Sequence, residues 1–141
     1  MKRSDEHFKE ALKLIPWGTQ TNAKRPFPDF DETMPKYIER GKGCRIWDIE
    51  GKEYIDFRLA LGPVILGYCY DEVDDAVREQ MKKGVLFSMA SPIELDLARL
   101  INQMIPNAEM VRFMKTGDDA NLCIIRIARA YSSRDIILTS G

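Results

Sequence analysis

The sequence predicts an α/β protein with two parts: an N-terminal helix with a small antiparallel meander, and then the beginning of a parallel sheet with helices. Short alternating segments separated by glycine-containing turns come early in the chain, and a strand–helix–strand pattern comes late. The pattern changes after Phe57, so we divide the chain into residues 1–57 and residues 58–141. A parallel sheet needs more strands than the second part supplies, so we expect that sheet to be incomplete.

The first part begins with a helix and continues into strands. Ser4 is expected as the N-cap, because the acidic residues Asp5 and Glu6 follow it and suit the first turn of a helix. Apolar residues then recur at helical spacing as far as Pro16. Three alternating segments joined by glycine turns predict an antiparallel meander, with strands at residues 37–40, 44–48 and 53–57.

The second part alternates helices with apolar segments. A helix is expected at residues 71–83, closed by Gly84. Ser91 and Glu94 have the spacing of a capping box and predict a second helix that runs to Ile105. A βαβ unit follows, with a strand at residues 109–114, a loop at 115–118, a helix at 119–131 and a strand at 136–139.

The composition excludes several classes of protein. The chain has 141 residues, with 21 Lys and Arg against 22 Asp and Glu, and a formal net charge of -1. Binding nucleic acid requires a clustered basic excess, so nucleic acid is excluded as a partner. The longest apolar runs are three or four residues, and a membrane span needs about 20. The charged N-terminus lacks a secretory signal, so we expect a cytoplasmic protein with no membrane partner. A chain of this length is expected to bury about two thirds of its unfolded surface.

The rare residues exclude the common catalytic and metal-binding groups. The single histidine, His7, is expected to face solvent on the first helix, so neither a multi-histidine metal site nor a Ser-His-Asp triad is predicted. The three cysteines, Cys44, Cys69 and Cys123, form no close pair and are interpreted as small buried apolar residues in a reducing compartment. Any chemistry must therefore come from backbone groups and from other side chains.

The loop at residues 115–120, with the sequence Lys-Thr-Gly-Asp-Asp-Ala, is the candidate ligand site. A glycine at the start of a helix lets backbone N–H groups face an anion, and the helix dipole adds about half a positive charge there, so a phosphate fits. The alternative is a plain helix cap formed by Asp118 or Asp119, whose charges oppose an anion. The residues alone leave both interpretations open.

Five segments of the chain also carry a resemblance to a known family. They follow one another in the family's order and cover nearly the whole chain, at residues 37–43, 47–56, 61–67, 109–113 and 126–131. Together they resemble the N-terminal part of a class III, fold-type I pyridoxal-phosphate-dependent aminotransferase of the glutamate-1-semialdehyde 2,1-aminomutase group. The resemblance implies a small N-terminal domain at residues 1–57 and the truncated start of a cofactor-binding large domain at residues 58–141.

The resemblance implies pyridoxal 5'-phosphate as cofactor, with its phosphate held by Thr116, Gly117 and Asp118. In the family the position of Asp118 typically holds Ser or Thr, whose hydroxyl donates to the phosphate. An ionised aspartate cannot donate and repels an anion, so this departure weakens the expected site. An acidic residue is usual at the position that Asp119 occupies.

On the substrate side, the resemblance implies roles for three residues. Lys24 and Arg25 lie near the place where aminomutases present an arginine to the substrate carboxylate; the alternative is a solvated loop pair. Ser88, with Phe87, matches a stretch that approaches the active site across a homodimer; the alternative is a strand-like packing segment. Ala60 and Leu61 replace the Ser-Trp of aminomutases, which makes the substrate wall more apolar and is closer to relatives associated with amination in sugar or polysaccharide biosynthesis.

The family's catalytic groups have no counterpart among these residues. The lysine that bonds the cofactor and the aspartate that protonates its ring come later in the family's sequence, and an aromatic residue that stacks on the ring is expected just beyond Gly141. No catalytic residue is therefore assigned. We expect either an inactive fragment of an enzyme that transfers an amino group from a donor to a carbonyl substrate, or a non-catalytic dimerising or binding module. Truncation would leave an apolar sheet edge and apolar helix faces uncovered, so we expect a homodimer or larger self-association.

Overall fold

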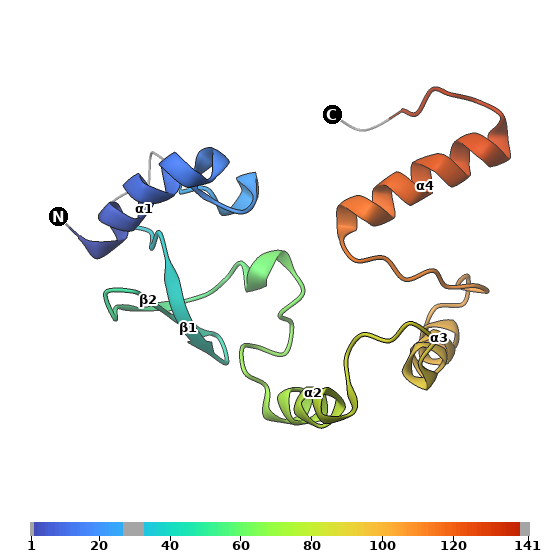
Figure 1. Cartoon of the computed structure of the whole chain (residues 1–141), viewed down its shortest axis with the longest axis horizontal. Helices are drawn as coiled ribbons and strands as arrows, with labels where there is room; N and C mark the ends of the chain where they lie inside the picture. Colours follow the sequence, from blue (N-terminus) through green and yellow to red (C-terminus); the bar gives the residue numbers. More distant parts are fainter. Residues whose placement is uncertain (1, 27–32, 139–141) are drawn as a thin grey trace. The chain divides into compact units, whose positions relative to one another are not determined.

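The computed structural model describes residues 2–26 and 33–138. The chain forms two compact units, Met1–Val85 and Leu86–Gly141, and each is described by itself. The first unit holds a helix, a three-stranded sheet and a second helix (Figure 1). The second unit holds two further helices.

Helix α1 (Arg3–Leu14) opens the first unit and begins one residue before the expected N-cap. Lys2 is the N-cap, and its backbone N–H donates to Asp5 Oδ2 at 3.3 Å. The prediction of Ser4 as cap is wrong because its backbone N–H donates instead to Glu50 Oε1 at 2.8 Å, and Ser4 is only 5% exposed. An ion pair of 2.6 Å between Lys36 Nζ and Asp5 Oδ1 makes a second connection from α1 to the chain before the sheet.

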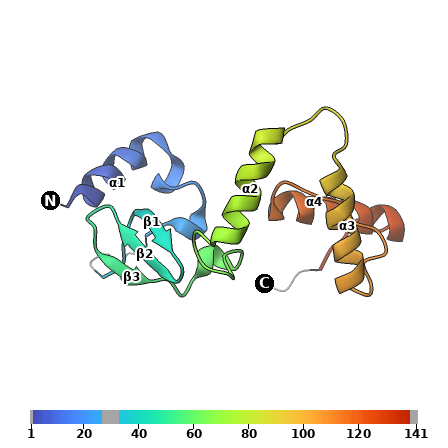
Figure 2. The ribbon, with the colours of Figure 1, turned by 90° about the horizontal axis from the view of Figure 1, so that it is seen from below.

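The predicted meander is confirmed. Strands β1 (Ile38–Lys42), β2 (Arg45–Asp48) and β3 (Glu53–Ile55) form an antiparallel sheet in the order β1-β2-β3 (Figure 2). Ile46 pairs with Gly41 on one side and with Tyr54 on the other. The first turn is tighter than expected, because β1 continues through Lys42.

Asp48 holds the turn between β2 and β3. Its side chain is 5% exposed, and Oδ1 accepts the backbone N–H groups of Glu50 at 3.1 Å and Lys52 at 2.8 Å. The Tyr54 hydroxyl donates to Oδ2 at 2.8 Å. Burial, together with this hydrogen bond to a carboxylate, raises the pKa of Tyr54 to about 12. The hydroxyl therefore remains a donor at any physiological pH.

A loop returns from β3 to the edge of β1. Backbone groups of Tyr68 and Gly43 exchange hydrogen bonds of 2.8 and 2.9 Å, which form an isolated antiparallel bridge. The Tyr68 ring lies directly over Gly41, where an added Cβ would come within 2.6 Å of Tyr68 Cγ. Gly41 is therefore required for close packing of the loop on the sheet.

Helix α2 (Asp71–Lys83) follows this loop and matches the predicted bounds. Lys42 Nζ donates to Cys69 O at 2.7 Å and to Asp71 Oδ1 at 2.8 Å, so the end of β1 contacts the start of α2. The prediction of Gly84 as the residue that closes this helix is confirmed, with φ 108° at that glycine.

The second unit contains helices α3 (Pro92–Met104) and α4 (Gly117–Ser132). The predicted capping box of α3 is confirmed: the Ser91 backbone N–H donates to Glu94 Oε1 at 3.0 Å. Helix α4 begins two residues earlier than expected and is followed by Ser133 in the left-handed conformation, with φ 53°.

Two predicted strands of the second unit do not form in the structure. Residues 109–114 contain no strand, and neither do residues 136–138; the last residue of the second predicted strand, Thr139, lies outside the described residues. A strand requires a neighbour that takes up its N–H and C=O groups, and the described sheet consists of the three antiparallel strands of the first unit. The local sequence pattern of these residues is therefore not sufficient to form a strand.

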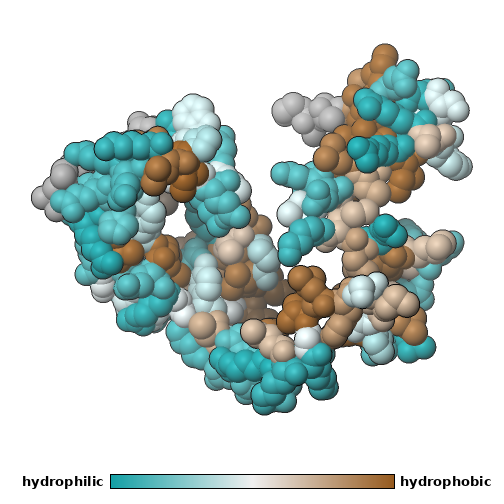
Figure 3. All heavy atoms as spheres, in the orientation of Figure 1, coloured by the Kyte–Doolittle hydropathy of each residue, from teal (hydrophilic) through white to brown (hydrophobic). Residues whose placement is uncertain are grey.

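The expected degree of burial is also wrong. No hydrophobic side chain in the described part of the chain is buried, and the accessible surface is 12535 Å², against about 7,500 Å² for a folded monomer of this mass. Figure 3 shows apolar side chains at the surface. The exposed apolar residues of the helices include Val77, Leu97 and Ile127. For the same reason Cys44 and Cys69 are exposed and Cys123 is half-buried, which corrects their interpretation as buried residues.

Replacing Gly41 by Ala should destabilise the first unit by about 1–3 kcal/mol, because the new methyl group overpacks the Tyr68 ring. Urea unfolding followed by the fluorescence of Trp47 in β2 measures the effect. Gly117→Ala is the matched control, because a Cβ there meets no atom within 4 Å. Equal unfolding midpoints for the two variants would contradict the packing role of Gly41.

Candidate phosphate site

The candidate site lies at the start of α4, and its cap is Thr116. Thr116 Oγ1 accepts the backbone N–H of Asp119 at 3.2 Å and donates to Asp119 Oδ2 at 2.9 Å. The first backbone bond of the helix joins Ala120 N–H to Thr116 O at 3.1 Å. The alternative of a cap formed by Asp118 or Asp119 is therefore wrong: the hydroxyl of Thr116 caps the helix, and Asp119 orients that hydroxyl.

Two backbone donors remain at this helix start. Gly117 and Asp118 occupy the first two helical positions, and in the described structure their N–H groups donate to no protein atom. Open space surrounds Gly117, since an added Cβ would meet nothing within 4 Å. Two exposed N–H groups at the positive end of a 16-residue helix are the donors that an anion requires. The backbone of the site therefore fits a phosphate group.

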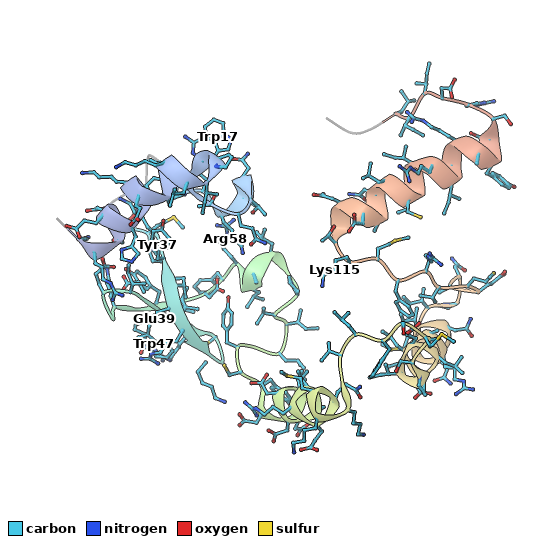
Figure 4. All side chains as sticks on the ribbon, viewed as in Figure 1. Trp17, Tyr37, Glu39, Trp47, Arg58 and Lys115 are labelled. Atoms are coloured by element: carbon cyan, nitrogen blue, oxygen red, sulfur yellow. The ribbon has the colours of Figure 1, made fainter. Side chains whose placement is uncertain are left out.

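Three charged side chains flank these donors, those of Lys115, Asp118 and Asp119, and all of them are exposed. Asp118 carries a negative charge beside its own N–H, which opposes an anion. Lys115 precedes the cap and is the single lysine between residues 86 and 141; Figure 4 shows it on the segment that leads into α4. Its ammonium group supplies a compensating positive charge within the same loop.

The predicted substrate residues Lys24 and Arg25 lie in the first unit, on an exposed turn after α1. Lys24 Nζ donates to Gln20 Oε1 at 2.9 Å. The Arg25 guanidinium stacks over the Trp17 ring, 4.3 Å from its centroid. Arg58 Nη2 supports the turn by donating to Ala23 O at 3.0 Å. Both basic side chains thus have local partners, and their substrate role stays a prediction.

Ser88 lies in the second unit, between α2 and α3, and its side chain is exposed. The neighbouring Phe87 is 54% exposed, so the segment is not packed in the described structure. The predicted site residues are therefore divided between the units: the substrate pair in the first, and Ser88 with Thr116, Gly117 and Asp118 in the second. A role for Ser88 also stays a prediction.

Sequence reasoning missed two tyrosine–carboxylate pairs in the first unit. Besides Tyr54 and Asp48, the Tyr68 hydroxyl donates to Asp56 Oδ2 at 2.7 Å. An aspartate before a glycine-containing turn is a local signal for the first pair. The second pair joins residues 12 apart across a loop and leaves no local pattern.

His7 is exposed on α1 as predicted, with its Nδ1 atom 2.9 Å from Arg3 O. Among residues 2–26 and 33–138 no cluster of three or more His, Cys, Asp or Glu side chains could hold a metal ion. Within the same residues no helix is long and apolar enough to span a membrane.

Comparison with known proteins decides the family. The model of the family "Aminotransferase class-III" matches residues 28–138. The chain belongs to this family. The predicted resemblance is confirmed, and with it the α/β fold class.

Individual relatives of this class-III aminotransferase chain support the assignment. It is 40% identical to a 3-aminobutyryl-CoA aminotransferase of Cloacimonas acidaminovorans, covering 100% of this chain and 34% of the relative. It is 38% identical to a glutamate-1-semialdehyde 2,1-aminomutase of Lachnoclostridium phytofermentans, over 98% of this chain and 32% of the relative. The chain therefore spans about a third of the length of these curated relatives.

Solved structures show the same fold. An omega-transaminase from Sphaerobacter thermophilus matches 94% of this chain and 29% of its own, with 31% identity and a TM-score of 0.84. The FumI protein of Sphingopyxis sp. MTA144, in its PLP internal aldimine form, matches 94% of this chain and 31% of its own, with 32% identity and a TM-score of 0.83. A glutamate-1-semialdehyde aminomutase from Pseudomonas aeruginosa, at 21% identity and a TM-score of 0.75, shows the fold alone.

Thr116→Ala should destabilise α4 by about 1 kcal/mol, because the Asp119 N–H loses its acceptor. Amide hydrogen exchange of the first turn of α4 measures this loss and should become faster. Thr116→Ser is the control, since it retains the hydroxyl and should exchange like the original chain. Equal exchange in the alanine variant would show that the hydroxyl does not cap the helix.

Proposed function

We propose that this chain is the N-terminal part of a pyridoxal 5'-phosphate-dependent aminotransferase or aminomutase, and that the start of α4 holds the cofactor phosphate. The observation that carries the proposal is the pair of exposed N–H groups of Gly117 and Asp118 at a helix start. Family membership supports it, as do the solved relatives that contain the cofactor, the FumI protein in its PLP internal aldimine form and a transaminase with PLP bound. When bound, the cofactor supplies the electron sink for amino transfer.

The chain's own residues would bind and orient the phosphate. The backbone N–H groups of Gly117 and Asp118 would donate to its oxygens, and the dipole of α4 would favour its charge. The Thr116 hydroxyl already donates to Asp119, so the proton that it could offer a phosphate is engaged. Lys115 would add long-range attraction from the same loop.

We propose that the described chain does not transfer an amino group by itself and contributes no catalytic residue. The lysines that the structure shows in ion pairs bind carboxylates of the fold, as Lys36 does with Asp5 and Lys42 with Asp71. Lys115 lies beside the candidate phosphate site, on the segment that leads into α4 (Figure 4). This is not the position of the family's cofactor-bonding lysine. An amino donor and a carbonyl substrate, in sugar or polysaccharide biosynthesis, would be the substrates of the whole enzyme.

Assembly, domains and location belong to the same proposal. We propose a homodimer, supported by the exposed apolar residues of the helices, such as Val77 and Leu97. We retain residues 1–57 and 58–141 as the small domain and the start of the large domain. The three free cysteines suit the reducing cytoplasm.

Asp118→Ser should strengthen the binding of inorganic phosphate, because the substitution removes a negative charge and restores a hydroxyl donor. Titration of both chains with phosphate, followed by the backbone amide NMR signals of Gly117 and residue 118, measures the affinity. We expect about tenfold tighter binding, the factor that a hydrogen bond to a charged group contributes. Asp96→Ser, an exposed change on α3, is the control. Equal phosphate affinities for the original chain and both variants would contradict the proposal, because the start of α4 would then be a helix cap and not an anion site.

The coding sequence after the codon for Gly141 tests the enzymatic part of the proposal. We expect the reading frame to continue and to encode an aromatic residue, then an aspartate and a lysine that provide the missing cofactor contacts. A stop codon directly after Gly141 would contradict an aminotransferase and support the non-catalytic binding module. Transaminase assays of the 141-residue chain should show no turnover in either case.

A further inference from the structure

Residues 57–67 form a loop whose two ends lie together on the edge of the sheet. At one end, Asp56 N–H donates to Cys44 O at 2.9 Å. At the other, Tyr68 N–H donates to Gly43 O at 2.8 Å. The Tyr68 hydroxyl then donates to Asp56 Oδ2 at 2.7 Å, which closes the loop by a side-chain bond. A compact surface loop with adjoining ends has the form of an Ω-loop, a type that is frequently functional.

The loop contains a strained turn. Three successive residues that are not glycine have positive φ angles: Leu59 at 49°, Ala60 at 51° and Leu61 at 68°. Gly62 follows with φ 114°. Such conformations are unfavourable for residues with a Cβ and persist where the surrounding structure enforces them. Interactions within the loop must therefore stabilise this turn.

Asp56 provides the restraint. Its Oδ1 accepts the Arg58 backbone N–H at 2.8 Å, directly before the strained residues, while Oδ2 accepts the Tyr68 hydroxyl. Burial alone would raise the pKa of Asp56, but the hydrogen bonds from Tyr68 and from the backbone of Arg58 and Leu59 outweigh burial, so its pKa is lowered. The bond to Asp56, followed by burial, raises the pKa of Tyr68 to about 12. The two groups thus remain a carboxylate and a phenol across the physiological pH range.

We propose that Asp56 and Tyr68 form a conformational clasp that keeps residues 57–67 closed and the turn at residues 59–62 left-handed. The closed loop holds Leu61 and Ile65 outward, with exposed fractions of 61% and 79%. Opening the clasp relieves the strained turn and lets these side chains move. A role of this loop as an apolar substrate wall, through Ala60 and Leu61, rests on the proposed function. The closure of the loop by Asp56 and Tyr68 does not depend on that function.

Limited proteolysis with trypsin tests the clasp, because Arg58 places a cleavage site just before the strained turn (Figure 4). The nearest other sites are Lys52 and Arg78. Tyr68→Phe removes the hydroxyl bond and retains the ring over Gly41. Cleavage after Arg58 should accelerate about tenfold, since cleavage of an opened segment follows its population and a bond to a charged group is lost.

Tyr54→Phe is the matched control, because it removes a hydroxyl bond of 2.8 Å to Asp48 in the same sheet but outside the loop. In this variant, the ratio of the cleavage rate after Arg58 to the cleavage rate after Lys13 in α1 should remain unchanged. Equal acceleration in both phenylalanine variants would overturn the clasp, because it would mean general loosening of the first unit.

Asp56→Ala keeps the test decisive if Tyr68→Phe is poorly folded, and the double variant tests the shared bond where both single variants fold. Asp56→Ala should accelerate cleavage more than Tyr68→Phe, since it also releases the Arg58 N–H, and the double variant should be no faster than Asp56→Ala. Additive rates in the double variant would contradict a shared bond. Phosphate binding at α4 is measured separately, so its absence would remove the proposed function without affecting this result.

Discussion

The hydrogen bonds of Asp48 are the constraint on which the first unit depends. A buried carboxylate is unfavourable unless its oxygens accept hydrogen bonds, and Asp48 receives three, from two backbone N–H groups and the Tyr54 hydroxyl. These bonds fix the turn that sets the register of β3 on β2. Glu50, in the same turn, accepts the Ser4 N–H and thereby attaches α1. One turn therefore organises both the sheet and the helix beside it.

Polar contacts supply the long-range order of this unit, because no apolar side chain in the described residues is buried. The Asp56–Tyr68 bond closes the loop after β3, and the Lys42–Asp71 pair brings α2 to the end of β1. Such bonds are directional and select one arrangement, whereas apolar burial is largely insensitive to direction. The apolar residues of α2, α3 and α4, such as Val77, Leu97 and Ile127, lie in solvent in the described structure.

Features that depend on neighbouring residues could be predicted from the sequence, and features that depend on distant partners could not. The capping box at Ser91 and Glu94 is complete within four residues and was predicted correctly. The start of α1 was misplaced because the Ser4 N–H takes its acceptor from Glu50, 46 residues away. The strand expected at residues 109–114 failed for the same reason, since a parallel strand is defined by neighbours that lie outside its own segment.

The candidate phosphate site shows why a cap and an anion site are not alternatives at the start of α4. Thr116 satisfies the Asp119 N–H, the third donor of the helix, and leaves the first two donors, at Gly117 and Asp118, exposed. A phosphate and the cap would thus use different backbone groups. The remaining conflict is the carboxylate of Asp118, which is exposed to solvent and salt and is therefore partly screened, whereas the N–H groups have a fixed direction. The backbone geometry favours an anion, and the side chain of Asp118 determines how strongly it binds.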